Sequence, residues 1–155
     1  MGRVARLPAH LLRLSGRAVS LALRDPRRAW LLVRMCFSYL SVTVFASFLP
    51  LTRSFELVSP RRPAPHAPPL SATEVVDAVD TLLRAGLPFI RPRCWRRAAV
   101  LHRYLALEGI RSQIVFGVIA ADLRLAEAHA WVERDGRPLG ETSPVDRYRK
   151  IHTFG

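Results

Sequence analysis

The sequence predicts an α+β fold in which a helix beginning at Cys94 packs on an antiparallel sheet, preceded by apolar amino-terminal helices. Three observations lead to this prediction. Residues 1–58 are basic and apolar with helical periodicity, residues 59–70 are rich in proline, and in residues 71–155 helical patterns give way to strand patterns. We therefore expect a helical region, a linker and a folded domain, in that order.

Two helices are expected before the linker. Leu7–Arg24 has a leucine-rich stripe at alternating spacings of four and three, flanked by arginines, which is typical of an amphipathic helix. Asp25 and Pro26 then have the pattern of an N-cap and a first helical position. Residues 29–49 are strongly apolar. The stretch without a charged residue, 35–51, has seventeen residues, slightly fewer than the roughly 20 that a helix needs to span a bilayer. We expect this helix to be buried or to lie on a membrane surface.

The linker is defined by its prolines. Proline fixes φ and removes a backbone donor, so a proline-rich segment is expected to be extended. Five prolines fall within ten residues: Pro60, Pro63, Pro65, Pro68 and Pro69.

Helices and then strands are expected in the last region. Ser71 and Glu74 have the spacing of a capping box, at the start of an apolar-faced helix that Gly86 ends. A second helix runs from Cys94 towards Gly109. Three strands follow, over residues 112–120, 128–134 and 137–141, and the last two flank a tight Asp-Gly turn.

The positive charge of the chain is concentrated near its amino terminus. The net charge is +12, and residues 1–62 carry eleven arginines against Asp25 and Glu56, a net charge of +9. Such a region favours anionic lipid, nucleic acid or an acidic protein, although a high-GC coding sequence explains the arginines equally well. No recognisable nucleic-acid-binding module interleaves these arginines with stacking aromatics, so we expect no nucleic-acid partner.

Cys94 is the candidate nucleophile. It opens a helix, where unpaired backbone N–H groups and the helix dipole favour a thiolate. Cys36 lies within the apolar run and is expected to be a structural residue. Two cysteines supply neither a disulfide framework nor a metal-binding pair, and His10, His66, His102 and His152 lack ligand spacing. We expect a reducing, cytoplasmic setting, with membrane association as an option, and no metal or cofactor.

His129 is the candidate general base. On a strand, His129 and Trp131 would point to one face, while the small residues Ala128 and Ala130 would pack against a helix on the other. A lone histidine is usually structural or solvated, so this role depends on a neighbouring cysteine and an orienting carboxylate.

Glu141 is the candidate third member, and the turn decides whether it can be. A two-residue loop would place Glu141 on the sheet face opposite His129. A three-residue loop of residues 134–136 would pair Glu133 with Arg137 and place His129 opposite Glu141, with Cβ atoms about 5 Å apart. We predict the three-residue loop, with other carboxylates as fallback partners: Asp122, Glu127 and Asp146.

These residues resemble a known family. The Cys-Trp-Arg-Arg-Ala helix start at Cys94, the apolar strand, and His-Ala-Trp-Val-Glu from His129 with its following Asp-Gly turn resemble the lasso-peptide leader peptidases. These are a transglutaminase-like branch of papain-like cysteine proteases. The resemblance covers about residues 72–145, and it implies that residues 71–155 form a transglutaminase-like catalytic domain. It further implies Cys94 as nucleophile, His129 as base and Glu141 at a position where aspartate is usual.

The resemblance also implies a reaction and partners. The protein would remove the leader from a ribosomally made precursor peptide and hand the new amine to an asparagine-synthetase-like cyclase. The first 60 residues lack the pattern of a fused recognition domain, so a separate leader-recognition protein is implied. Two alternatives remain: a transglutaminase-like acyltransferase, and a non-enzymatic membrane- or partner-binding adaptor in which Cys94 and His129 only pack.

Overall fold

The structure, a computed structural model, describes residues 25–60, 62–66, 68–85, 87, 90, 93–119, 127–142 and 144–155. The helix predicted over Leu7–Arg24 lies outside these residues. Within the described residues, four helices and four strands follow one another: α2 (Pro26–Phe48), α3 (Leu51–Val58), α4 (Ala72–Arg84), α5 (Cys94–Leu107), β1 (Gln113–Ile119), β2 (Glu127–Arg134), β3 (Arg137–Pro138) and β4 (Arg149–Phe154). Helices combined with an antiparallel sheet confirm the predicted α+β class.

The helix starts follow from local sequence. Asp25 caps α2 by accepting a hydrogen bond from the Arg28 N–H at 2.9 Å, with Pro26 at the first helical position. Ser71 and Glu74 form the predicted capping box of α4. The length and composition of α2 would also allow it to cross a membrane, and 28% of its most apolar 18-residue stretch is buried in the structure.

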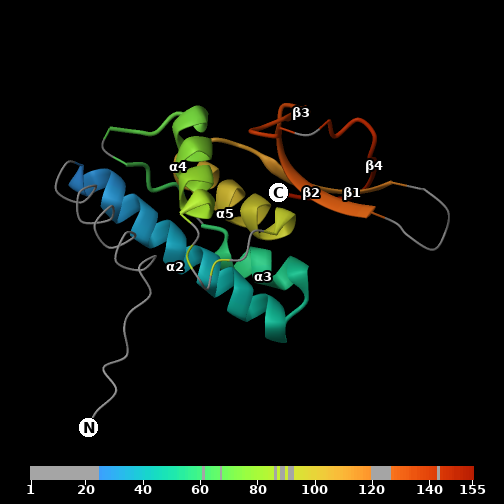
Figure 1. Cartoon of the computed structure of the whole chain (residues 1–155), viewed down its shortest axis with the longest axis horizontal. Helices are drawn as coiled ribbons and strands as arrows, with labels where there is room; N and C mark the ends of the chain where they lie inside the picture. The colour runs from blue at the N-terminus through green and yellow to red at the C-terminus, as the bar shows by residue number, and fades with distance from the viewer. Residues whose placement is uncertain are drawn as a thin grey trace, which may run out of the picture.

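One hydrophobic core joins the helices on both sides of the proline-rich segment. Met35 and Tyr39 of α2 and Phe55 of α3 are at most 1% exposed and belong to the same core as Val79 and Leu101. Helix α5 contacts α2 and α4 as well as strands β1 and β2. In Figure 1 the helices fill one side of the molecule and the sheet extends from the other.

The proline-rich segment is fastened to the end of α5. The Ala64 N–H donates to the Leu107 carbonyl at 2.8 Å, and the Leu70 N–H donates to the Glu108 carboxylate at 3.0 Å. The ring Nδ1 and the backbone N–H of His66 both contact this carboxylate, whose side chain is fully buried. The predicted linker therefore connects two parts of one core and is itself held by it.

The sheet has the strand order β3-β2-β1-β4, with all neighbours antiparallel. Strands β1 and β2 match their predicted positions, whereas β4 was not predicted from the sequence. Ala130 and Val132 of β2 and Ile114 of β1 enter the core on the face that packs against α5. Trp131 and Val115 alternate to the other face, where they meet Tyr148.

The predicted three-residue hairpin loop is wrong. Asp135 and Gly136 form a two-residue turn, with φ values of 52° and 75°, and Arg134 pairs with Arg137. Both central residues take left-handed conformations, as the commonest hairpin turn requires, and Asp-Gly is a preferred sequence for it. The predicted cross-strand pair of Glu133 and Arg137 is not formed. Glu133 instead accepts hydrogen bonds from other residues of the sheet, Trp131 and Lys150.

Candidate active site

Cys94 is the first residue of α5. The preceding residue, Arg93, is extended (φ −137°, ψ 133°), and no side chain caps this end of the helix. The first backbone N–H groups of α5 can therefore donate to another acceptor, and the helix dipole favours negative charge at this end of the helix. The Cys94 side chain is partly buried against the core, and the cysteine is free.

A tyrosine from α2 holds this helix start in place. The Tyr39 hydroxyl lies near Arg93 and Arg96, at the start of α5. Tyr39 is fully buried, and this burial raises the pKa of its hydroxyl, partly offset by the two arginines. The start of α5 is therefore packed against α2.

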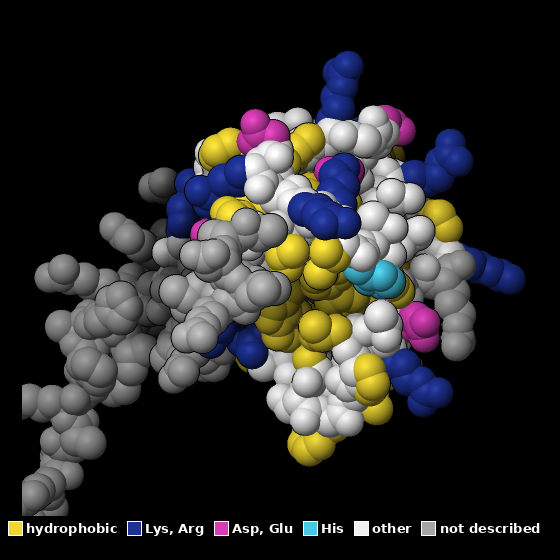
Figure 2. Space-filling model, turned by 90° about the vertical axis from the view of Figure 1, so that its right-hand side faces the viewer, with side chains coloured by type: hydrophobic (Ala, Val, Ile, Leu, Met, Phe, Trp, Pro, Cys, Tyr) yellow, Lys and Arg dark blue, Asp and Glu magenta, His cyan; other side chains and the backbone are white. Residues whose placement is uncertain are grey.

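Aromatic side chains line the core beside Cys94. Phe55 of α3 lies between Trp95 of α5 and Phe116 of β1, with ring centroids 6.4 and 6.0 Å away. The Arg96 guanidinium lies over the Trp95 ring, 5.0 Å from its centroid. On the side of the molecule where the sheet lies, apolar side chains gather around a hollow, with a histidine and several Lys or Arg side chains near it (Figure 2).

His129 lies on the sheet face opposite α5. Its ring stacks on Trp131, with centroids 5.9 Å apart, and lies tilted against Tyr148, with centroids 5.3 Å apart. The Trp131 indole N–H donates to Glu133 at 2.8 Å, and Lys150 donates to the same carboxylate at 2.7 Å. Strand β3 pairs only with the end of β2, so His129 lies in a part of β2 that β3 does not cover.

Glu141 reaches His129 by a route that the sequence did not predict. Oε2 of Glu141 lies 3.2 Å from Nε2 of His129, although β3 ends at Pro138. Gly140 makes this possible, because its φ is +66° and an added Cβ would lie 2.5 Å from Val76. The chain leaves the sheet after Pro138, so the alternation of strand faces no longer applies to Glu141.

Arg97 connects this pair to α5. Its guanidinium donates to Oε1 of Glu141 at 2.7 Å, to the Gly140 carbonyl at 2.6 Å and to the Asp80 carboxylate of α4 at 2.9 Å. The side chains of Arg97 and Glu141 are only 16% and 11% exposed, so solvent screens this contact little. Sequence reasoning missed Arg97, although its spacing of three residues from Cys94 places both on one side of a helix.

The predicted site residues are thus brought together in part. His129 and Glu141 are in direct contact, and Arg97 joins Glu141 to the helix that Cys94 opens. Within the described part of the chain, no hydrogen bond joins the Cys94 thiol to the imidazole. Cys94 opens α5, whereas His129 lies on the sheet face opposite that helix, so the structure brings His129 to Glu141 but not to Cys94.

The fallback carboxylates have other partners or lie outside the described residues. Glu127 accepts a hydrogen bond from the Tyr148 hydroxyl at 2.6 Å, and Asp146 accepts one from the Arg147 N–H at 3.1 Å. Asp122 belongs to the residues that the structure does not describe. Glu141 is the carboxylate that hydrogen-bonds His129 in the described chain.

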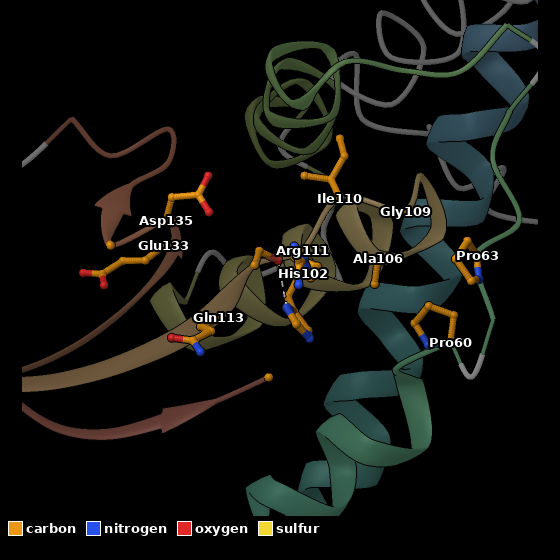
Figure 3. A pocket seen from close by; sticks show the side chains of 13 residues that line it. Pro60, Pro63, His102, Ala106, Gly109, Ile110, Arg111, Gln113, Glu133 and Asp135 are labelled. Carbon is orange, nitrogen blue, oxygen red and sulfur yellow. Dashed lines mark hydrogen bonds between the residues drawn. The ribbon is translucent and has the colours of Figure 1, made fainter.

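A separate cavity of about 700 Å³ lies at the other end of α5 (Figure 3). His102 and Ala106 from the second half of α5 border it, together with Pro60 and Pro63. Nδ1 of His102 lies 3.0 Å from the Ser112 hydroxyl, and burial lowers the pKa of this imidazole. None of the three predicted site residues lines this cavity.

Comparison with known families gives a match over most of the chain. The model of the transglutaminase-like superfamily matches residues 36–153. The chain belongs to the transglutaminase-like superfamily. This family is typically one of cysteine-based enzymes, with protease or acyltransferase activity. Searches of curated proteins and of solved structures gave no significant match.

Proposed function

We propose that this transglutaminase-like protein is a cysteine peptidase that removes the leader from a ribosomally synthesised lasso-peptide precursor. The observation that carries the proposal is the His129–Glu141 contact at 3.2 Å, tied by Arg97 to the helix that begins at Cys94. A nucleophile, a base and an orienting acid are the parts that acyl transfer through a thioester requires.

In the proposed mechanism, Nε2–H of His129 donates a hydrogen bond to the Glu141 carboxylate, and the proton stays on the imidazole. Nδ1 is then the ring nitrogen left to take the Cys94 proton, and the thiolate attacks the scissile carbonyl. The uncapped N–H groups at the start of α5 can donate to the developing oxyanion. The imidazolium protonates the departing amine, and water then releases the leader as a carboxylic acid.

The lasso-peptide substrate rests on the sequence around Cys94 and His129. The Cys-Trp-Arg-Arg-Ala and His-Ala-Trp-Val-Glu segments are similar to those of the leader peptidases. On this basis the partners are a precursor peptide, a separate leader-recognition protein and an asparagine-synthetase-like cyclase, and the setting is the cytoplasm.

The test is leader release followed by mass spectrometry. The purified protein is incubated with a lasso-type precursor peptide that carries its leader and with a leader-recognition protein. We expect cleavage by the unaltered protein and by Cys36→Ser, which is the matched cysteine control, but not by Cys94→Ser. An intact precursor in every reaction, with recognition-protein binding confirmed, would overturn the proposal.

Acyl transfer to an amine is the second candidate, because the superfamily includes both outcomes for the thioester. Running the reaction in ¹⁸O-labelled water with added lysine peptide separates the two. Hydrolysis places the label in the new carboxylate of the leader, whereas acyl transfer gives an amide of the leader without it.

A further inference from the structure

Helix α2 carries a row of exposed apolar side chains, which we call the α2 stripe. At about 100° per residue, its members fall within roughly 60° of one another around the helix axis. Their exposed fractions range from 52% to 82%, which is unusual for large apolar residues: Trp30, Val33, Phe37, Val44 and Phe48. These five side chains therefore share one side of α2 and are not scattered around it.

The opposite side of α2 is fixed in the core. Met35, Tyr39 and Val42 are fully buried, and α2 contacts α3, α4 and α5. A helix that crossed a bilayer would have to leave these contacts, although its length and composition would allow it to cross. Whatever covers the α2 stripe must therefore approach it from the side and leave the core intact.

Positive charge lies near the amino-terminal half of the α2 stripe. Arg27 and Arg28 are exposed in the first turn of α2. A hollow of about 340 Å³ runs along the stripe, and its border includes Arg34 and Arg103 beside Trp30. Residues 27–34 carry three arginines and no acidic residue.

We propose that the α2 stripe lies on an anionic lipid surface, with the helix parallel to the membrane. An exposed apolar helix face with tryptophan and phenylalanine, flanked by arginines, matches the chemistry of the headgroup region. The aromatic side chains enter the boundary between headgroups and acyl chains, and the arginines contact lipid phosphates. This inference is independent of the proposed peptidase activity.

The experiment is flotation of the full chain with two kinds of vesicle, one of phosphatidylcholine alone and one also containing phosphatidylglycerol. We expect binding to the anionic vesicles at low salt and release at high salt, because screening weakens the arginine contacts. Quenching of tryptophan fluorescence by brominated lipid should be strong in the unaltered protein and lost in Trp30→Phe.

Two variants test the two halves of the surface. Phe37→Ser combined with Phe48→Ser should weaken vesicle binding at least about tenfold, since two large apolar groups no longer leave water. Arg27→Gln should weaken binding about fivefold, and only to the anionic vesicles. Ile151→Ser is the matched control, because Ile151 is 60% exposed on β4, outside the stripe.

Three kinds of result would overturn the proposal. The first is equal binding by the double serine variant, or no binding to either vesicle. The second is a dimer of the unaltered protein that the double serine variant converts to a monomer, because a second copy would then cover the stripe. The third is retention on vesicles after carbonate extraction, which indicates a spanning helix.

Leader release from a soluble precursor is measured in parallel, so that loss of lipid binding and loss of catalysis are told apart.

Discussion

At the scale of single residues, Arg97 is the group that connects the candidate base and acid to the helix of the nucleophile. Its guanidinium uses three nitrogens on three acceptors, from Asp80, Gly140 and Glu141. A planar fork of donors can hold a carboxylate in one orientation, whereas an ammonium group cannot. Arg97 is therefore a positioning residue for Glu141.

Replacing Arg97 tests this role. Arg97→Met should lower kcat for leader release about 10–100-fold, as loss of a supporting partner of a site residue commonly does. KM should change by less than about twofold, because Arg97 reaches the chemistry only through Glu141. Arg97→Lys should recover only part of kcat, and Arg134→Lys, at an exposed hairpin position, should have no effect. An unchanged kcat with a lowered Tm would show that Arg97 is only structural.

His102 makes a prediction about stability and pH. Its folded-state pKa is lowered by burial, so the unfolded chain binds a proton more readily. The free energy of unfolding should therefore fall as the pH decreases below about 6.5, the ordinary histidine value. Urea unfolding of the protein and of His102→Gln between neutral and mildly acid pH measures this, and the variant should show a shallower decrease. Identical slopes would contradict the prediction.

At the scale of elements, the β1–β2 pair supports the imidazole. Gly117 lies directly opposite His129, and a Cβ there would be 2.7 Å from the Trp131 ring. The absent side chain lets the indole lie across β1, and His129 stacks on that indole. The pairing of the two strands thus fixes the ring that carries the candidate base.

Gly117→Ala should disturb this arrangement. We expect a loss of about 1–3 kcal/mol in the free energy of unfolding, because the Trp131 ring must move within a packed layer. The near-ultraviolet circular dichroism of the indole should change with it. Gly136→Ala is the control: nothing lies within 4 Å of its added Cβ, so only its left-handed backbone costs about 1 kcal/mol. Equal effects of the two variants would argue against the packing explanation.

At the scale of the whole molecule, the amino-terminal helices and the sheet share one core. Tyr39 and Phe55, which precede the linker, are buried in the same core as elements that follow it. The Glu108 carboxylate accepts a hydrogen bond from the linker. The family match likewise begins at residue 36, within α2. The part of the chain that carries the candidate site is therefore packed against α2 and α3.

A shortened chain tests this dependence. A protein beginning at residue 71 should lack a cooperative thermal transition, because the surfaces of α4 and α5 that contact α2 would be exposed to water. A protein beginning at residue 25 keeps those contacts and should unfold cooperatively. Circular dichroism on heating distinguishes them. A sharp transition of the shorter protein near the Tm of the full chain would show that residues 71–155 fold independently.

The sequence predicted what depends on local chemistry. The caps of Asp25 and Ser71, the α5 start at Cys94 and strands β1 and β2 follow from neighbouring residues. The hairpin loop was predicted wrongly, because a favourable Glu133–Arg137 pair was given more weight than the preference of Asp-Gly for a two-residue turn.

Long-range features were beyond the reach of sequence patterns. The contact of Glu141 with His129 depends on Gly140 and on the early end of β3, neither of which follows from strand alternation. Strand β4 carries mostly exposed side chains and has a bulge against β1, so its pattern is weak. The contacts of Arg97 and of Tyr39 are made with residues at least 17 positions away in the sequence. No local sequence pattern predicts such contacts.

The stacking of His129 on Trp131 gives the protein an internal optical reporter. A protonated imidazole accepts an electron from an excited indole and quenches its emission, whereas a neutral imidazole does so much less. With Trp30→Phe and Trp95→Phe, the remaining indole lies 5.9 Å from the candidate base, centroid to centroid. Its brightness then reports the state of that ring, and a bound peptide that altered this state would be seen without any label.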